Sequence, residues 1–186
     1  MRLSPATRLP SFPQLLADDR RMTVRVQAED FDIGAEIEAL TSGNLRIGGV
    51  ASFMGVVREM AGEQAIDAMT LEHYPGMTEK KLAEIEAEAY DRWPLEASLI
   101  IHRYGRLEPG DRIVLVVTAA KSRGPALASC EFLIDWLKTK APFWKLEETP
   151  DGGQWVDARS SDGRAAERWL TDKPQDKPKG KPNAAE

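Results

Sequence analysis

The chain has 186 residues, of which 42% are hydrophobic and 30% charged, a balance that suffices for one buried core. Its formal net charge of −5 argues against a nucleic-acid binder, because neutralising phosphates requires a basic surface. The longest apolar runs, such as the IVLVV that starts at Ile113, fall far short of the roughly 20 residues of a membrane helix, so no membrane association is expected. The single cysteine, Cys130, excludes an internal disulfide and fits a reducing, cytoplasmic environment.

Composition divides the chain into one domain and two tails. Residues 1–21 contain three prolines and lack the apolar centre of a secretory signal, so we expect a disordered N-terminal extension, with Met22 as an alternative start. Residues 171–186 are rich in proline and lysine and contain no large apolar residue, so they cannot offset the entropy lost on ordering. We therefore expect a single domain over residues 22–170 and a disordered C-terminal tail.

The first half of this domain predicts one helix between strands. The alternating TVRVQ from residue 23 is typical of a strand. Ile33, Ile37 and Leu40 have helical spacing, with Asp30 or Asp32 as the cap and Gly43 as the end. Residues 48–59 and 66–74 then predict two strands, which could pair as a hairpin around a turn at residue 62.

The second half predicts three more helices. Thr78 can cap a helix that ends at Trp93, with Leu82, Ile85 and Ala89 on one face. Strands at residues 98–105 and 112–120 flank a Pro-Gly-Asp turn. A helix from about residue 125 to 139 follows, then a short strand at 154–158 and a helix at 162–170. The expected class is α+β, with mostly antiparallel strands and about four helices.

Two lysines near Pro142 are candidates for chemistry. Lys138 lies four residues after Ile134 on a partly apolar helix face, and burial of its amine would lower its pKa and favour a nucleophile or proton carrier. The alternative is a solvated lysine that stabilises a helix C-terminus. Lys145 follows the aromatic pair Phe143 and Trp144, which could wall a flat ring or pack in the core.

Two arginines extend this cationic set. Arg58 ends a glycine-rich strand, and Arg123 lies between a strand and a helix, where backbone amides also attract anions. With Lys138 and Lys145 they make four cations near the ends of elements in an acidic chain. This pattern predicts binding of an anionic small molecule or the anionic end of a partner.

The remaining candidates have structural interpretations. His73 and His102 have no neighbours at metal-ligand spacing, so we expect them to be structural and expect no metal. Cys130 fits a small core residue on the third helix. The phosphate-binding and nucleophile-elbow glycine motifs are absent, and no cofactor is expected.

Several stretches, in order and spacing, resemble a known family. LEHYPGMTEK, RWPL, IHRYGRLEPGD and LKTKAPFWK are similar to the large, catalytic subunit of molybdopterin synthase, over about residues 22–170. The resemblance implies an α/β-hammerhead-like fold and a sulfurtransferase of molybdenum cofactor biosynthesis. It also implies a homodimer with a small ubiquitin-like sulfur-carrier subunit at each end, which makes a heterotetramer. Sulfur would pass twice from the carrier's C-terminal Gly-Gly thiocarboxylate to cyclic pyranopterin monophosphate, forming the dithiolene of molybdopterin. Molybdenum would enter later, on another protein.

The resemblance also assigns site residues. The family's essential lysine corresponds to Lys138 and its second lysine to Lys145, and the substrate-binding residues also include Val56, Val57, Arg58, Leu146 and Glu147. The family's His-Arg pair, from the second subunit, reads Ser122-Arg123 here. The missing histidine leaves two alternatives. Lys121 can supply the lost charge as an auxiliary residue, or the chain is a weakened homologue that mainly docks the carrier.

Overall fold

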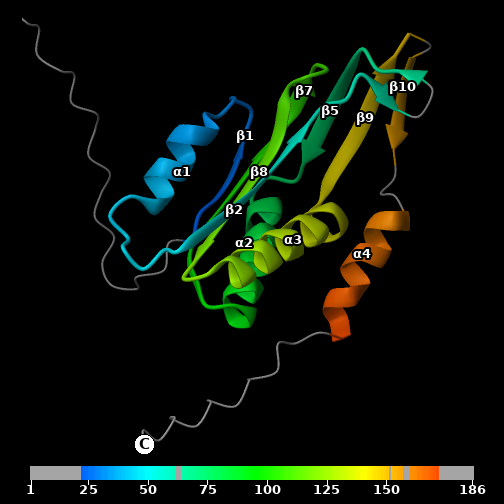
Figure 1. Ribbon diagram of the computed structural model, residues 1–186. Helices are drawn as coiled ribbons and strands as arrows, with labels where there is room; N and C mark the ends of the chain where they lie inside the picture. Colours follow the sequence, from blue (N-terminus) through cyan, green and yellow to red (C-terminus); the bar gives the residue numbers. More distant parts are fainter. Residues whose placement is uncertain (1–21, 62–63, 151, 157–159, 172–186) are drawn as a thin grey trace, which may run out of the picture.

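The computed structural model describes residues 22–61, 64–150, 152–156 and 160–171 (Figure 1). The expectations for residues 1–21 and 172–186 lie outside the described residues. Within the described part, no helix has the length and apolar character needed to cross a membrane.

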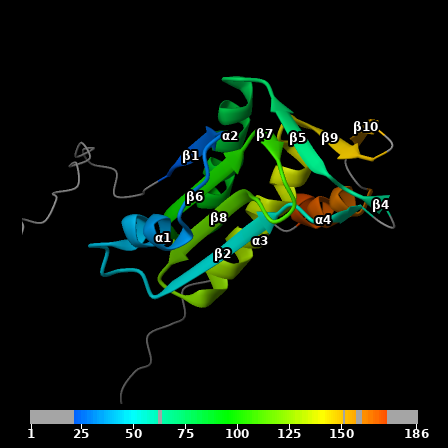
Figure 2. The ribbon, with the colours of Figure 1, turned by 90° about the horizontal axis from the view of Figure 1, so that it is seen from above.

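The first sheet forms the centre of the molecule. Its strands run in the order β1 (Val24–Gln27), β6 (Leu95–Arg103), β8 (Arg112–Ala120) and β2 (Gly49–Val56). All neighbours are antiparallel except β1 and β6. The long strands β6 and β8 are buried along most of their length because helices cover both faces of the sheet. Figure 2 shows α1 (Ile33–Thr41) on one side, and α2 (Met77–Arg92) and α3 (Arg123–Lys140) on the other.

Two apolar layers hold the helices to this sheet. The layer under α2 and α3 contains Leu82, Ile85, Ile100, Val116, Phe132 and Leu133, among others. The layer under α1 contains Phe31, Leu40, Leu99, Ile101, Leu115 and Val117. Alternate residues of β6 and β8 therefore belong to opposite layers, as the two-residue period of a strand requires.

The helix ends follow local chemistry. Asp32 caps α1 as predicted, since its Oδ1 accepts a hydrogen bond from the Ala35 N–H at 2.9 Å. The predicted Thr78 cap of α2 is wrong. Gly76 occupies that position with a φ of +80°, and its N–H donates to Glu79 at 2.6 Å. Thr78 is instead buried, and its hydroxyl donates to a backbone carbonyl of the preceding turn.

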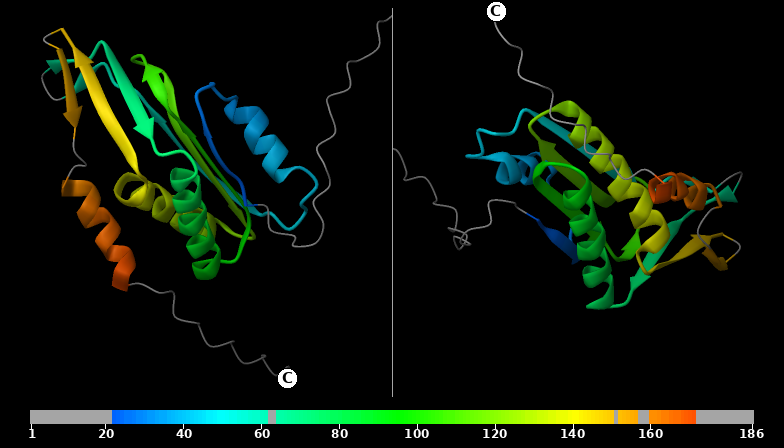
Figure 3. Two further views of the ribbon diagram at one scale, coloured as in Figure 1. Left: turned by 180° about the vertical axis from the view of Figure 1, so that it is seen from behind. Right: turned by 90° about the horizontal axis from the view of Figure 1, so that it is seen from below.

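The C-terminal helix α4 (Ser160–Thr171) packs against α3, as Figure 3 shows. Trp169 makes edge-to-face contacts with Trp93 and Phe132, with ring centroids 5.7 and 5.5 Å apart. Its indole N–H donates to Asp135 of α3 at 2.8 Å. These contacts join the end of the described chain to the main core.

The second sheet corrects one sequence prediction. It contains four strands in the order β10 (Gly152–Val156), β9 (Phe143–Thr149), β5 (Ala68–His73) and β7 (Gly105–Leu107). The predicted hairpin of residues 48–59 with 66–74 is wrong, because β2 pairs with β8 whereas β5 pairs with β9 and β7. Only the short strands β3 (Met60–Ala61) and β4 (Gln64–Ala65) pair locally. The expected α+β class, with mostly antiparallel strands, is confirmed, and the described residues form four helices.

Candidate functional site

A cavity of about 600 Å³ lies where the two sheets approach the C-terminal end of α3. Its apolar wall comes mainly from β2, β5, β8 and α3, with Val156 of β10 at one edge. Five of its lining residues have ionisable side chains: Arg58, His102, Lys138, Lys145 and Glu147. Three basic side chains, against the single carboxylate of Glu147, give this cavity a net positive charge on a chain whose formal net charge is −5.

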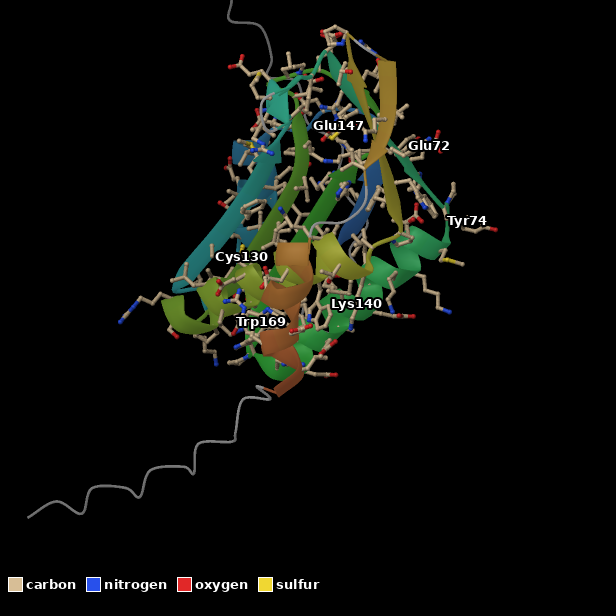
Figure 4. All side chains as sticks on the ribbon, turned by 90° about the vertical axis from the view of Figure 1, so that its right-hand side faces the viewer. Glu72, Tyr74, Cys130, Lys140, Glu147 and Trp169 are labelled. Carbon is tan, nitrogen blue, oxygen red and sulfur yellow. The ribbon has the colours of Figure 1, made fainter. Side chains whose placement is uncertain are left out.

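Strand β9 supplies two of these groups, and its register explains which ones. Lys145 pairs with Leu71 and Glu147 with Met69, so both face the cavity along with Phe143. Figure 4 shows Glu147 on the inner side of this sheet and Glu72 on the outer side. Leu146, between Lys145 and Glu147, does not line the cavity of this chain, and its assigned role in substrate binding stays a prediction.

The aromatic pair is divided by the same alternation. Phe143 faces the cavity, whereas Trp144 is 52% exposed. Of the two alternatives for this pair, Phe143 can wall a ligand, whereas Trp144 neither lines the cavity nor packs in the core. Lys145 also lies within β9 rather than near the end of an element. Strand β9 is not among the elements predicted from the sequence.

The two lysines differ in their contacts. Lys145 Nζ donates to Glu147 Oε1 at 2.7 Å, and the Glu147 side chain is only 13% exposed. Lys138 lies in the last turn of α3, is exposed, and has no hydrogen-bond or ion-pair partner among the described residues. Lys140, two residues later, instead packs over the Trp136 ring at 3.5 Å and lies apart from Glu147 in Figure 4. Lys138 is thus the lysine of this helix end that remains available to a ligand.

Arg58 reaches the cavity because strand β2 ends in an irregularity. The pairing register shifts between Gly55 and Val56, and the Val57 N–H bonds the Asp111 carbonyl at 2.9 Å. Val56, Val57 and Arg58 all line the cavity as a result. Arg58 is exposed and has no ion-pair partner within the described ranges. The structure thus brings together three of the four predicted cations.

The fourth cation lies elsewhere. Arg123 is the first residue of α3, and Lys138 follows 15 residues later, which is roughly 22 Å along a helix axis. Ser122 is the N-cap, but its hydroxyl makes no capping hydrogen bond. The loop packs against the start of β2, where a Cβ at Gly48 would overlap the Lys121 carbonyl oxygen. Within one chain, Lys121, Ser122 and Arg123 are therefore separate from the cavity.

His102 is a lining residue that the sequence reasoning treated as structural. Its Nδ1 is 2.9 Å from the Arg103 carbonyl oxygen, and its ring stacks on Phe143 with centroids 3.8 Å apart. Burial lowers the pKa of His102 to about 4, so the ring is neutral near pH 7. Strand alternation could have indicated this position, because His102 shares a face with the core residue Ile100.

Cys130 is a buried core residue, as expected. Burial raises the pKa of its thiol to about 11, which leaves little thiolate near pH 7. Among the described residues, no group of three His, Cys, Asp or Glu side chains is arranged to hold a metal ion.

The fold and the cavity define a class of protein: a mixed α/β protein with an apolar pocket whose basic groups suit an anionic ligand. The family model described as "MoaE protein" matches residues 26–140. The chain belongs to the MoaE family.

Relatives cover most of the chain. The molybdopterin synthase catalytic subunit of Ralstonia nicotianae is 56% identical over 147 residues, which are 79% of this chain and 84% of that protein. The molybdopterin biosynthesis MoaE protein of Burkholderia ambifaria has a solved structure with a TM-score of 0.70 and 55% identity, covering 81% of this chain and 99% of that one. The crystal structure of molybdopterin synthase from Staphylococcus aureus matches with a TM-score of 0.67 and 31% identity, over 72% of this chain and 96% of that one.

Proposed function

We propose that this chain is the catalytic subunit of a molybdopterin synthase. In this role it transfers sulfur from the C-terminal thiocarboxylate of a small carrier protein to cyclic pyranopterin monophosphate. The observation that carries the proposal is the convergence of Arg58, Lys138 and Lys145 on one cavity. Both reactants are anions, and fixed cations in a partly apolar pocket can bind a phosphate and a thiocarboxylate together.

Each basic group has a distinct task in this proposal. Arg58 presents a planar fork suited to the substrate phosphate. Lys145, held at 2.7 Å from Glu147, supplies a positioned charge where negative charge develops on the leaving oxygen. Lys138, which has no partner in the described structure, can transfer protons or attack the acyl carbon of the thioester that forms when the carrier's sulfur bonds to the substrate. That attack breaks the acyl C–S bond, so the sulfur stays on the substrate and the carrier's C-terminus becomes an amide on Lys138, which water must then hydrolyse.

The distant loop suggests why two copies would be needed. Arg123 is roughly 22 Å along α3 from Lys138 and cannot serve the cavity of its own chain. We place Lys121, Ser122 and Arg123 at the cavity of a second copy, with one ubiquitin-like carrier on each copy, so that the assembly is a heterotetramer. The single buried cysteine fits a reducing compartment, and we propose the cytoplasm as the site of action.

Reconstitution tests this function. The chain is mixed with thiocarboxylated carrier and cyclic pyranopterin monophosphate, and molybdopterin is measured as its fluorescent oxidation product. Product formation that depends on both partners supports the proposal, whereas no product with a carrier that is active with another synthase would contradict it.

A second candidate function is a homologue that docks the carrier but turns over slowly. Ser122, in place of the histidine expected from the family resemblance, favours it, because a hydroxyl has no cationic form. Carrier binding without product would support this candidate.

A further inference from the structure

The cavity contains one polar group that the proposed function does not use. Arg58, Lys138 and Lys145 can only donate hydrogen bonds, and Glu147 is engaged with Lys145. His102 is the remaining ionisable lining residue in the described part of the chain. Its role depends on which ring nitrogen carries the proton.

The contacts of His102 determine its tautomer. A backbone carbonyl only accepts hydrogen bonds, so the 2.9 Å contact with the Arg103 oxygen places a proton on Nδ1. The low pKa of this imidazole keeps it neutral near pH 7, and Nε2 therefore carries a lone pair. No described residue donates to Nε2.

The ring is also held in place. It stacks on Phe143 at 3.8 Å with an interplanar angle of 18°, and Phe143 is two residues before Lys145 on β9. The His102 ring on β6 is thus held against β9, the strand that also carries Lys145. His102 and Lys145 both line this cavity, so one ligand can contact both side chains.

We propose that His102 Nε2 accepts a hydrogen bond from an N–H group of the ligand in the cavity and thereby orients that ligand. The inference rests on the proposed function, in which both reactants carry N–H groups: the pterin ring of the substrate and the terminal peptide amides of the carrier. A neutral acceptor beside cations discriminates between ligands. It does not attract phosphate, and a ligand that lacks the N–H would displace water from Nε2 without replacing its hydrogen bond.

The test uses the small number of histidines. The chain contains two histidines, so nitrogen NMR of protein labelled with ¹⁵N-histidine resolves both rings. In the His73→Phe variant, His102 is the one remaining histidine, which assigns its signals. His73 is a matched control, since its ring also lies near Phe143, at 6.1 Å, but does not line the cavity. The probes, added separately, are cyclic pyranopterin monophosphate and a peptide that ends in Gly-Gly with a free carboxylate.

We expect free His102 to show the Nδ1–H tautomer, and its Nε2 resonance to move when one of the probes binds. The probe that moves it identifies the N–H source. His102→Phe, which keeps a stacked ring without nitrogens, should weaken binding of that probe roughly 3- to 10-fold. In the assay, the corresponding KM should rise by a similar factor. His102→Gln, which restores an acceptor, should recover much of the loss, and His73→Phe should behave like the wild type.

Two results would overturn the inference while leaving the proposed function intact. One is a His102 Nε2 resonance that does not move when either probe binds, although Lys138→Ala weakens the binding of both probes. The other is His102→Phe with wild-type KM and affinity for both reactants. Binding of neither probe to the wild type would instead reject the proposed function together with this inference.

Discussion

Glu86 on α2 should make the fold less stable at alkaline pH. It is only 1% exposed, and its carboxylate accepts hydrogen bonds from the Thr23 N–H and the Ser98 hydroxyl. Burial nevertheless raises its pKa from the ordinary 4.5 to about 7, because two hydrogen bonds do not replace the lost hydration. Replacing Glu86 by the neutral isostere glutamine removes this cost and preserves an acceptor for both donors.

The size and sign of the effect follow from proton linkage. Because the folded state holds the proton more tightly, the penalty is absent below pH 4.5, grows as pH rises, and is complete above about pH 7. A pKa difference between 4.5 and about 7 corresponds to about 3 kcal/mol. Glu86→Gln should therefore raise the free energy of unfolding by up to this amount at pH 8 and change it little at pH 4.5.

Urea unfolding, followed by tryptophan fluorescence at several pH values, measures this difference. Glu84→Gln is the matched control on the same helix. Glu84 pairs with Lys81, and that hydrogen bond lowers its pKa, so it titrates below the window used here. A stability difference between Glu86→Gln and the wild type that is equal at pH 5 and pH 8 would refute the reasoning.

Three further predictions concern the proposed reaction. Lys138→Ala should lower kcat by roughly 10²-fold or more with the melting temperature unchanged, and Lys138→Arg should not restore it, because a guanidinium cannot release a proton; a rescue in single-turnover assays would leave only an electrostatic role. Cys130→Ala should retain sulfur transfer with a modest loss of stability, since the thiol is buried; a folded but inactive variant would indicate a persulfide relay. Lys121→Ala should raise KM for the pterin roughly tenfold or more, and adding Ser122→His should reverse much of this rise. An unchanged KM at saturating carrier would contradict the hypothesis that Lys121 supplies the charge lost with the histidine.

Local patterns in the sequence predicted the elements better than their pairing. The α1 helix and the strands β6 and β8 follow from periodicity and caps over fewer than 20 residues. The partners of β2 and β5 depend on residues 34 or more positions away, from the pairing of Leu71 with Gly105 to that of Gly49 with Ala120. Strands that follow each other in sequence are a reasonable first choice as pairing partners. In this protein, β2 and β5 pair instead with strands that are distant in sequence.

The candidate site shows the same division. The basic character of Arg58, Lys138 and Lys145 could be read from the chain, but only the fold places them around one cavity. Arg123 carries the same charge and lies at the other end of α3. His102 was interpreted as structural, because its contacts with a backbone carbonyl and a stacked ring leave no pattern in the sequence.

The helix that separates Arg123 from Lys138 also constrains how this chain can change. An α-helix advances 1.5 Å and turns about 100° per residue. One residue inserted between these two positions would turn one end relative to the other by that angle, so at most one of them could keep its direction. Substitutions along the solvent side of α3 leave this phase intact, whereas insertions and deletions do not. If a second copy uses Arg123, the length of α3 sets the spacing between two cavities, and gains or losses of residues should be confined to the surrounding loops.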